Sequence, residues 1–249
     1  MYANSSLHFS VAPHMYAAYF DNAVIILDGK NDNYLSLIDE AADYFCFILK
    51  HKFVQENNQY YCIDAPDHAE THTYWITHFL EKDFITLSSC PTQLSAPLQE
   101  GGLIGYRWDA KNSWSPFAHA SVAGIIQAYY MLYKIDTSMK RTGISAIIDL
   151  LKQECFAKNN HNPSEQEIKK LSASVDAASL LYPKKIYCLA WAATFTTLAL
   201  KKGWRCNLVI GVQTNPFYAH AWAECAGSVI HDDPIIARVL SIIFRGPYT

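Results

Sequence analysis

The sequence lacks any run of 18 or more consecutive apolar residues, which is about the length that a helix needs to cross a bilayer. Its first residues also lack the basic segment and apolar core of a secretory signal. Internal repeats and glycine-rich phosphate loops of the Walker type are absent as well. We therefore expect a cytoplasmic protein with no membrane partner and no nucleotide held in such a loop.

Closely spaced cysteine pairs are also missing. The seven cysteines are an odd number, and none forms the Cys-x-x-Cys spacing typical of zinc and redox motifs. We predict no disulfide framework, no metal site and reduced thiols. Cys206 and Cys225 are interpreted as packing residues, because free cysteines are mostly small buried groups.

Positive charge is scarce. The chain has 20 Lys and Arg against 23 Asp and Glu, and residues 1–85 contain four lysines and no arginine. Binding to a phosphate backbone needs clustered Lys and Arg, so we expect no nucleic-acid partner. With 51% apolar and 17% charged residues, the 249-residue chain is typical of a globular protein of one large or two small domains.

The chain divides into two parts by pattern. Strand-like segments lie at 15–20, 23–27 and 34–38, and helix-like segments at 40–50 and 67–84. Three small strands and two or three helices predict a winged-helix-like domain over residues 1–90. Gly, Pro and Ser are densest over 87–116, so we place a linker at 91–116 and a second domain at 117–249.

The second domain is predicted to begin with helices and to end with strands, which gives an α+β protein. Helices are expected at 117–133, 143–153, 164–181 and 185–202, and strands at 207–212, 218–224 and 229–234. The residues of the first of these helices that are predicted to face the core are Val122, Ile125, Ile126, Tyr129 and Leu132.

One cysteine differs from the others in its context. Cys188 lies in the first turn of the predicted helix 185–202, where the partial positive charge of the helix start favours thiolate over thiol. Nucleophilic cysteine chemistry also needs a nearby imidazole and a group that orients it. His220 on the strand 218–224 and an acid on the next strand supply both. Each residue alone is more often a core residue, and their combination favours catalysis.

Strand pairing alone leaves the identity of the acid open. A two-residue loop at Ala226-Gly227 places Asp233 opposite His220, whereas a three-residue loop that includes Ser228 places Asp232 on the face of His220. We predict the three-residue loop and Asp232. His231 and Asp232 are adjacent on this strand and point to opposite faces, so they are not expected to share a metal.

The residues from Leu208 to Glu224, Cys188-Leu189 upstream and Gly227 to Asp232 downstream resemble the signature of lasso-peptide B proteins, the maturation peptidases of the microcin J25 type. The resemblance implies a papain/transglutaminase-like cysteine protease domain. It also implies a triad of Cys188, His220 and Asp232. The family usually has Asn before the triad acid, where this chain has His231.

The resemblance implies removal of a leader peptide. The winged-helix-like domain, similar in layout to the leader-recognition module of the family, binds the leader of a lasso-peptide precursor. Cleavage then supplies the core peptide to a partner macrocyclase that is similar to asparagine synthetase. We expect no cofactor on this chain, and we assign any ATP dependence to the cyclase.

An exposed edge strand can accept an extended peptide, and side chains of a neighbouring helix can add specificity. The candidate leader contacts are Tyr34, Leu35, Leu37, Trp75 and Phe79. Two other functions stay open, an acyltransferase of the transglutaminase or arylamine N-acetyltransferase type and a non-catalytic peptide-binding adaptor. The backbone N–H of Cys188 is the one oxyanion donor that the sequence indicates.

Overall fold

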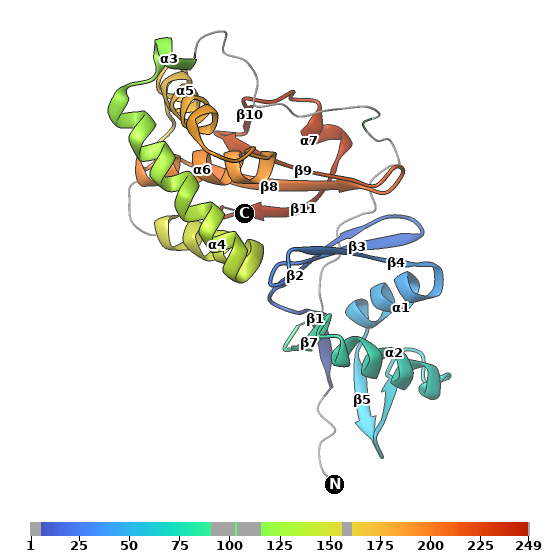
Figure 1. The fold of residues 1–249 in the computed structure, drawn as a ribbon. Coiled ribbons are helices and arrows are strands. Elements are labelled where there is room, and N and C mark those ends of the chain that lie inside the picture. The colour runs from blue at the N-terminus through green and yellow to red at the C-terminus, as the bar shows by residue number, and fades with distance from the viewer. Residues whose placement is uncertain (1–5, 91–102, 104–115, 156–160, 249) are drawn as a thin grey trace. The chain divides into compact units, whose positions relative to one another are not determined.

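The computed structural model describes residues 6–90, 103, 116–155 and 161–248, in a mixed α+β fold with several small antiparallel sheets (Figure 1). The chain forms two compact units. The N-terminal unit comprises Met1–Gly29 and Asn33–Gln99, and the C-terminal unit comprises Lys30–Asp32 and Glu100–Thr249. The predicted linker 91–116 lies outside the described residues except for positions 103 and 116.

The N-terminal unit contains the three strands predicted for it. They are β2 (Met15–Tyr19), β3 (Ala23–Asp28) and β4 (Asn33–Ile38), followed by helix α1 (Asp39–Lys50). The strands pair in the order β2-β3-β4, so β4 is an edge of this sheet. Buried Val24 and Ile26 of β3 contribute to the core, since alternate side chains of a strand share one face.

Two further strand pairs of this unit escaped the sequence prediction. Strand β1 (His8–Val11) pairs with β7 (Ile85–Ser88), and β5 (Phe53–Glu56) pairs with β6 (Gln59–Cys62). Each is only four residues long, too short to show a periodic pattern. Phe53 is the first residue of β5 and is fully buried.

Helix α2 (Ala69–Glu81) packs against α1 and strand β6. Phe45 of α1 and Phe79 of α2 meet edge to face with ring centroids 5.4 Å apart, and both are fully buried. Ile48 and Ile76 complete this contact in the same cluster. The apolar stripes of the two helices thus form the core of the unit.

The C-terminal unit combines helices with a four-stranded antiparallel sheet. Its helices are α3 (Pro116–His119), α4 (Val122–Cys155), α5 (Glu165–Leu181), α6 (Cys188–Lys201) and α7 (Ile236–Val239). Its strands are β8 (Cys206–Gln213), β9 (Tyr218–Cys225), β10 (Ser228–Ile230) and β11 (Ser241–Gly246). The strand order is β10-β9-β8-β11, and α6 packs against both α4 and β9 (Figure 1).

Helix α4 corrects one prediction. It is interrupted at Thr142 and Gly143, which matches the two helices expected there. Its exposed side, however, carries Val122, Ile126 and Tyr129, which were predicted to face the core. The helix is apolar around most of its circumference, so its sequence did not identify the buried face.

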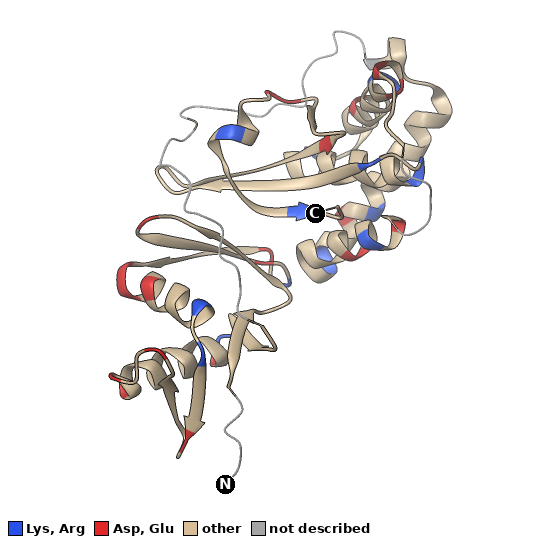
Figure 2. Ribbon diagram, turned by 180° about the vertical axis from the view of Figure 1, so that it is seen from behind, with Lys and Arg blue, Asp and Glu red and all other residues tan. Residues whose placement is uncertain are grey.

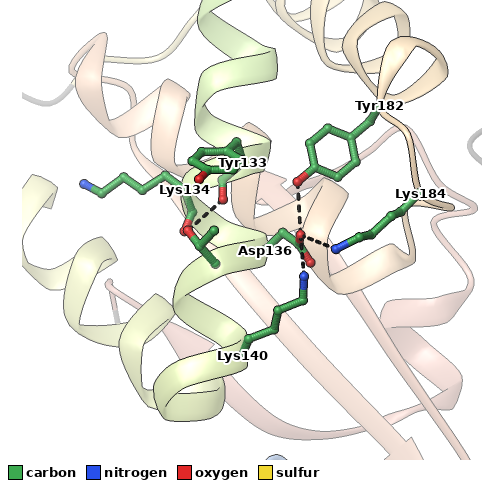
Figure 3. A network of polar contacts seen from close by, with 7 residues as sticks. Tyr133, Lys134, Asp136, Lys140, Tyr182 and Lys184 are labelled. Carbon is green, nitrogen blue, oxygen red and sulfur yellow. Dashed lines mark hydrogen bonds and ion pairs between the residues drawn. The ribbon is translucent and has the colours of Figure 1, made fainter.

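The segment that leads into α6 is held by Asp136 of α4 (Figure 3). Asp136 Oδ2 accepts hydrogen bonds from the Tyr182 hydroxyl at 3.0 Å and from Lys184 Nζ at 3.0 Å. Lys140 Nζ donates a third at 2.9 Å. These bonds, first that from Lys140, hold the pKa of Asp136 below its usual value. Because Tyr182 and Lys184 shortly precede α6, the network constrains how the chain enters that helix.

Cys206 and Cys225 form a disulfide in the structure, which corrects the prediction that they are free packing residues. They are direct partners in the β8–β9 ladder, and their Cα atoms are 4.3 Å apart. Nineteen residues separate them in sequence, so only the register of the two strands reveals that they meet. The other described cysteines are free thiols.

Acidic residues outnumber basic ones in the N-terminal unit (Figure 2). Residues 6–90 contain 12 Asp and Glu against four Lys and no Arg. Such a surface repels a phosphate backbone. Among the described residues, no helix has the length and apolar character needed to cross a membrane.

Candidate active site

Cys188 is the first residue of α6, after an extended Tyr187 that supplies no side-chain cap. The first N–H groups of a helix have no partner within the helix, so they point at groups near its start. Cys188 is partly exposed, unlike the buried middle of α6. The predicted position of the cysteine at a helix start is therefore found in the structure.

Strand β9 presents His220 on one face together with Tyr218 and Trp222. The three rings are stacked, with centroids 6.0 Å apart for Tyr218 and His220 and 6.1 Å apart for His220 and Trp222. Burial first, and then the charges of Cys188 and Asp232, raise the pKa of Tyr218 to about 12. Tyr218 is therefore a neutral phenol beside the histidine at neutral pH.

His220 lies between the cysteine and an acid. His220 Nε2 is 2.6 Å from Asp232 Oδ2, and both side chains are buried. The Cys188 thiol also interacts with His220, and this interaction shifts the pKa of both groups. Because Nε2 faces the carboxylate, Nδ1 is the ring nitrogen that remains for the thiol. The structure thus brings together the three residues that the sequence singled out.

The pKa values in this group shift toward an ion pair. Burial by itself raises the pKa of the Cys188 thiol, but hydrogen bonds, first that from His220, outweigh burial and lower it. Backbone hydrogen bonds from Ala221 and Leu189 act in the same direction. Burial also lowers the pKa of His220, whereas its bonds to Asp232 and Cys188 raise it to about 9. Both shifts favour the thiolate–imidazolium pair relative to the same groups in water.

The hairpin that carries Asp232 differs from the prediction. Ser228 pairs with Cys225 across a two-residue turn, and Ala226 and Gly227 both have positive φ, at 49° and 79°. This is the two-residue loop, not the three-residue loop that we predicted. In a regular continuation of this ladder, Asp232 would face away from His220.

Asp232 nevertheless reaches His220, because the strand ends before it. Strand β10 stops at Ile230, and His231 adopts a left-handed conformation with φ of 59°. This single residue breaks the alternation of side chains and turns Asp232 toward His220. Asp233 instead accepts a hydrogen bond at Oδ1 from the backbone N–H of Ile235 at 2.9 Å, so it caps the next turn.

His231, Asp176 and Trp191 form a buried cluster beside the site that the sequence did not reveal. The His231 ring stacks on Trp191 with centroids 4.8 Å apart, and its Nε2 lies 3.3 Å from Asp176 Oδ2. Trp191 Nε1 donates to Asp176 Oδ1 at 2.8 Å. Burial chiefly raises the pKa of Asp176, while His231 and Trp191 lower it. The one sequence signal for this cluster is Asp176 itself, a charged residue among the small, mostly apolar residues of helix α5.

Buried Trp222 of β9 stacks on His220 and is itself held by hydrogen bonding. Its Nε1 donates to Glu224 Oε1 at 2.9 Å, and Glu224 also pairs with Arg245 of β11. Gly211 is the direct ladder partner of His220. A Cβ atom at Gly211 would lie only 2.8 Å from the Trp222 ring, so this ring occupies the space that a side chain there would need.

The candidate leader contacts all lie in the N-terminal unit. Tyr34, Leu35 and Leu37 are partly buried on edge strand β4. Trp75 is half-buried on α2 and stacks on Tyr44 of α1 with centroids 5.8 Å apart. Phe79 has no exposed surface, so it is a core residue that supports α2 rather than a surface contact. No cluster of three or more His, Cys, Asp or Glu that could hold a metal occurs in the described part of the chain.

Comparison with known proteins finds similarity in the C-terminal part of the chain. Residues 130–243 match the sequence profile of the transglutaminase-like superfamily. The chain is 32% identical over 89 residues to the microcin J25-processing protein McjB of Escherichia coli, across 34% of this chain and 43% of that protein. The matched region thus spans less than half of the relative. No solved structure matches the chain. The predicted resemblance to transglutaminase-like proteins of this kind is confirmed.

Proposed function

We propose that this protein is a cysteine peptidase that removes the leader peptide from a lasso-peptide precursor. The observation that carries the proposal is the arrangement of three residues. His220 lies against Asp232 and interacts with Cys188, which begins α6. All three lie inside the region that matches the transglutaminase-like superfamily. Similarity to a microcin J25-processing protein supports a peptide precursor as the substrate.

In the proposed reaction, the Cys188 thiolate attacks the carbonyl carbon at the end of the leader. The negative charge on the carbonyl oxygen is met by backbone N–H groups, with that of Cys188 as the first candidate. Protonated His220 then gives its proton to the leaving amine, which is the new N-terminus of the core peptide. The leader remains as a thioester on Cys188. Water loses a proton to His220, attacks this thioester and releases the leader carboxylate.

Asp232 has an orienting role in this scheme. Its Oδ2 accepts the Nε2–H of His220, which leaves Nδ1 to exchange protons with Cys188 and the leaving amine. A buried carboxylate also stabilises the imidazolium between the two steps. The raised pKa of His220, about 9, fits a group that must hold a proton until the leaving amine needs it.

We assign leader binding to the N-terminal unit, as a winged-helix-like module. Edge strand β4 offers backbone groups that an extended peptide can pair with, in the manner of strand addition. Trp75 and Tyr44 form an aromatic pair on the adjacent helices that can receive an apolar leader side chain. The net charge of residues 6–90 is about 4 − 12 = −8, which favours a basic leader over nucleic acid.

The freed core peptide passes to a separate macrocyclase similar to asparagine synthetase. We assign ATP use to that partner and propose that this chain needs no cofactor for cleavage, since attack, proton transfer and orientation are all supplied by its own side chains.

The test is incubation of the protein with a candidate lasso-peptide precursor, followed by mass spectrometry. The expected products are the intact leader carboxylic acid and the core peptide with a free amine, and Cys188→Ala yields neither. An acyl transfer to an added amine in place of water would instead indicate a transglutaminase-type acyltransferase. Precursor binding without any reaction by the native chain would indicate an adaptor.

A further inference from the structure

Asp232 lies just after strand β10, which ends at Ile230. The cluster of Asp176, Trp191 and His231 lies at the same place. His231 is the left-handed residue that directs Asp232 toward His220. Left-handed backbone is unfavourable for any residue with a Cβ, so it persists only where contacts of the side chain or backbone fix it. The contacts of the His231 ring are therefore candidates for what stabilises the left-handed backbone of this residue.

Two elements hold the His231 ring from different sides. Trp191 of α6 stacks on it at 4.8 Å with an interplanar angle of 16°, and Phe195 in turn stacks on Trp191 at 5.5 Å. Asp176 of α5 lies 3.3 Å from His231 Nε2 and also accepts the Trp191 indole N–H. Trp191 thus covers a face of the ring, and the Asp176 carboxylate approaches its edge at ion-pair distance.

Asp176 is costly as a structural residue. It is 4% exposed and sits among buried Ser172, Ala173 and Val175 of α5. A well-packed apolar side chain at such a position is often as stabilising as a buried ion pair, or more so. Its presence is explained if the carboxylate is needed to orient its two partners.

The cluster also connects the nucleophile to the acid. Trp191 lies three residues after Cys188, hence on the same side of helix α6. Packed residues therefore connect Cys188 to Asp232. Trp191 follows Cys188 on α6 and stacks on His231, and His231 directly precedes Asp232.

We propose that Asp176, Trp191 and His231 are positioning residues that hold the backbone at His231 in its left-handed form and thereby keep Asp232 against His220. This inference rests on the proposed function, because it assigns a role within the same catalytic group. We assign them an effect on the reaction that passes through Asp232.

The experiment measures alkylation of each cysteine by iodoacetamide at pH 6 and pH 9.5, resolved by peptide mass spectrometry. The variants are Asp176→Asn, which keeps size and removes charge, and His231→Gly, which accepts positive φ and removes the ring. Glu165→Gln, on the same helix as Asp176 but exposed, is the control. Exposed Cys90 serves as the internal reference in every sample.

If Asp232 moves away from His220, the imidazolium loses the carboxylate that stabilises it. The pKa of Cys188 then rises, and a smaller fraction of the thiol is ionised at pH 6. We expect the rate of Cys188 alkylation at pH 6 to fall at least about tenfold in Asp176→Asn and His231→Gly, the effect of one pKa unit, and to change little at pH 9.5. Glu165→Gln is expected to match the native protein at both values. Precursor cleavage should lose kcat with little change in KM.

The outcomes separate the two proposals. Native Cys188 that reacts no faster than Cys90 at pH 6 overturns the catalytic group and, with it, the positioning role. If native Cys188 is alkylated faster than Cys90 at pH 6, and folded Asp176→Asn and His231→Gly give the same rates as the native protein, only the positioning role is overturned. If Asp176→Asn does not fold, His231→Gly decides, because an unchanged profile there means that the ring is not what fixes Asp232.

Discussion

Two adjacent acids, Asp232 and Asp233, offer a sharp test of the site, since only the first contacts His220. Asp232 Oδ2 is 2.6 Å from His220 Nε2 in a buried environment. Asp233 is exposed, and its side chain accepts the backbone N–H of Ile235 at 2.9 Å. Substitution by Asn preserves the shape of either side chain and removes one charge from each.

The two substitutions should differ widely in effect. In Asp232→Asn, an amide that donates to Nε2 moves the ring proton to Nδ1, where it blocks transfer from Cys188. The imidazolium also loses its buried counter-charge. Loss of the orienting acid typically costs on the order of a thousandfold in kcat, which is about 4 kcal/mol of transition-state stabilisation. In Asp233→Asn, the amide oxygen still accepts from Ile235, so we expect a loss of less than about tenfold, in line with a cap worth roughly 1 kcal/mol.

The measurement is steady-state cleavage of the precursor by native protein and both variants, with folding verified by circular dichroism. The pH at which Cys188 alkylation reaches half its maximum should also rise in Asp232→Asn and stay in place in Asp233→Asn. Greater damage from Asp233→Asn, with both proteins folded, would refute the assignment and the loop conformation on which it stands.

Three further predictions follow from the same geometry. Cys188→Ala should abolish cleavage while the affinity for a fluorescent leader peptide stays within about twofold, and residual cleavage at a comparable rate would exclude this thiol as nucleophile. His220 has its pKa raised from 6.5 to about 9, so its stabilising effect, roughly 3 kcal/mol, is fully present below pH 6.5 and lost as pH rises through 9. Thermal melts from pH 6 to 10 should show this loss in the native protein and much less of it in Asp232→Asn. Gly211→Ala places a Cβ 2.8 Å from Trp222 and from Leu240, so chemical denaturation should show a loss of about 1–3 kcal/mol.

Local patterns predicted the long and regular elements. The three strands β2 to β4, the helices α1, α2, α5 and α6 and the hairpin β8–β9 all lie near their expected positions. The four-residue strands β1, β5, β6 and β7 were missed because they are too short to show a periodic pattern, and β1 and β7 in addition pair with partners far along the chain. The disulfide between Cys206 and Cys225 was missed for the same reason, since strand register, not cysteine spacing, brings these residues together.

The candidate site was predicted more fully than its surroundings. Cys188 at a helix start and His220 on a strand follow from local sequence, since each depends on one element. The cluster of Asp176, Trp191 and His231 joins α5, α6 and the end of β10, three elements separated by many residues. No single segment carries its pattern, so only the tertiary structure reveals it.

Asp232 lies against His220, although the reasoning from strand register that led to it was wrong. That reasoning assumed regular alternation through residue 232, whereas the left-handed backbone of His231 ends it. Asn, the usual residue there in the family that the sequence resembles, tolerates left-handed backbone better than most residues, and His is also enriched there. A β-branched residue does not tolerate it, so His231→Val should displace Asp232 and lose nearly all cleavage. His231→Asn accepts the turn but lacks the ring contacts with Trp191 and Asp176, so it should lose only part of the cleavage activity. Equal activity of the two variants would show that the left-handed backbone is not what directs the acid to His220.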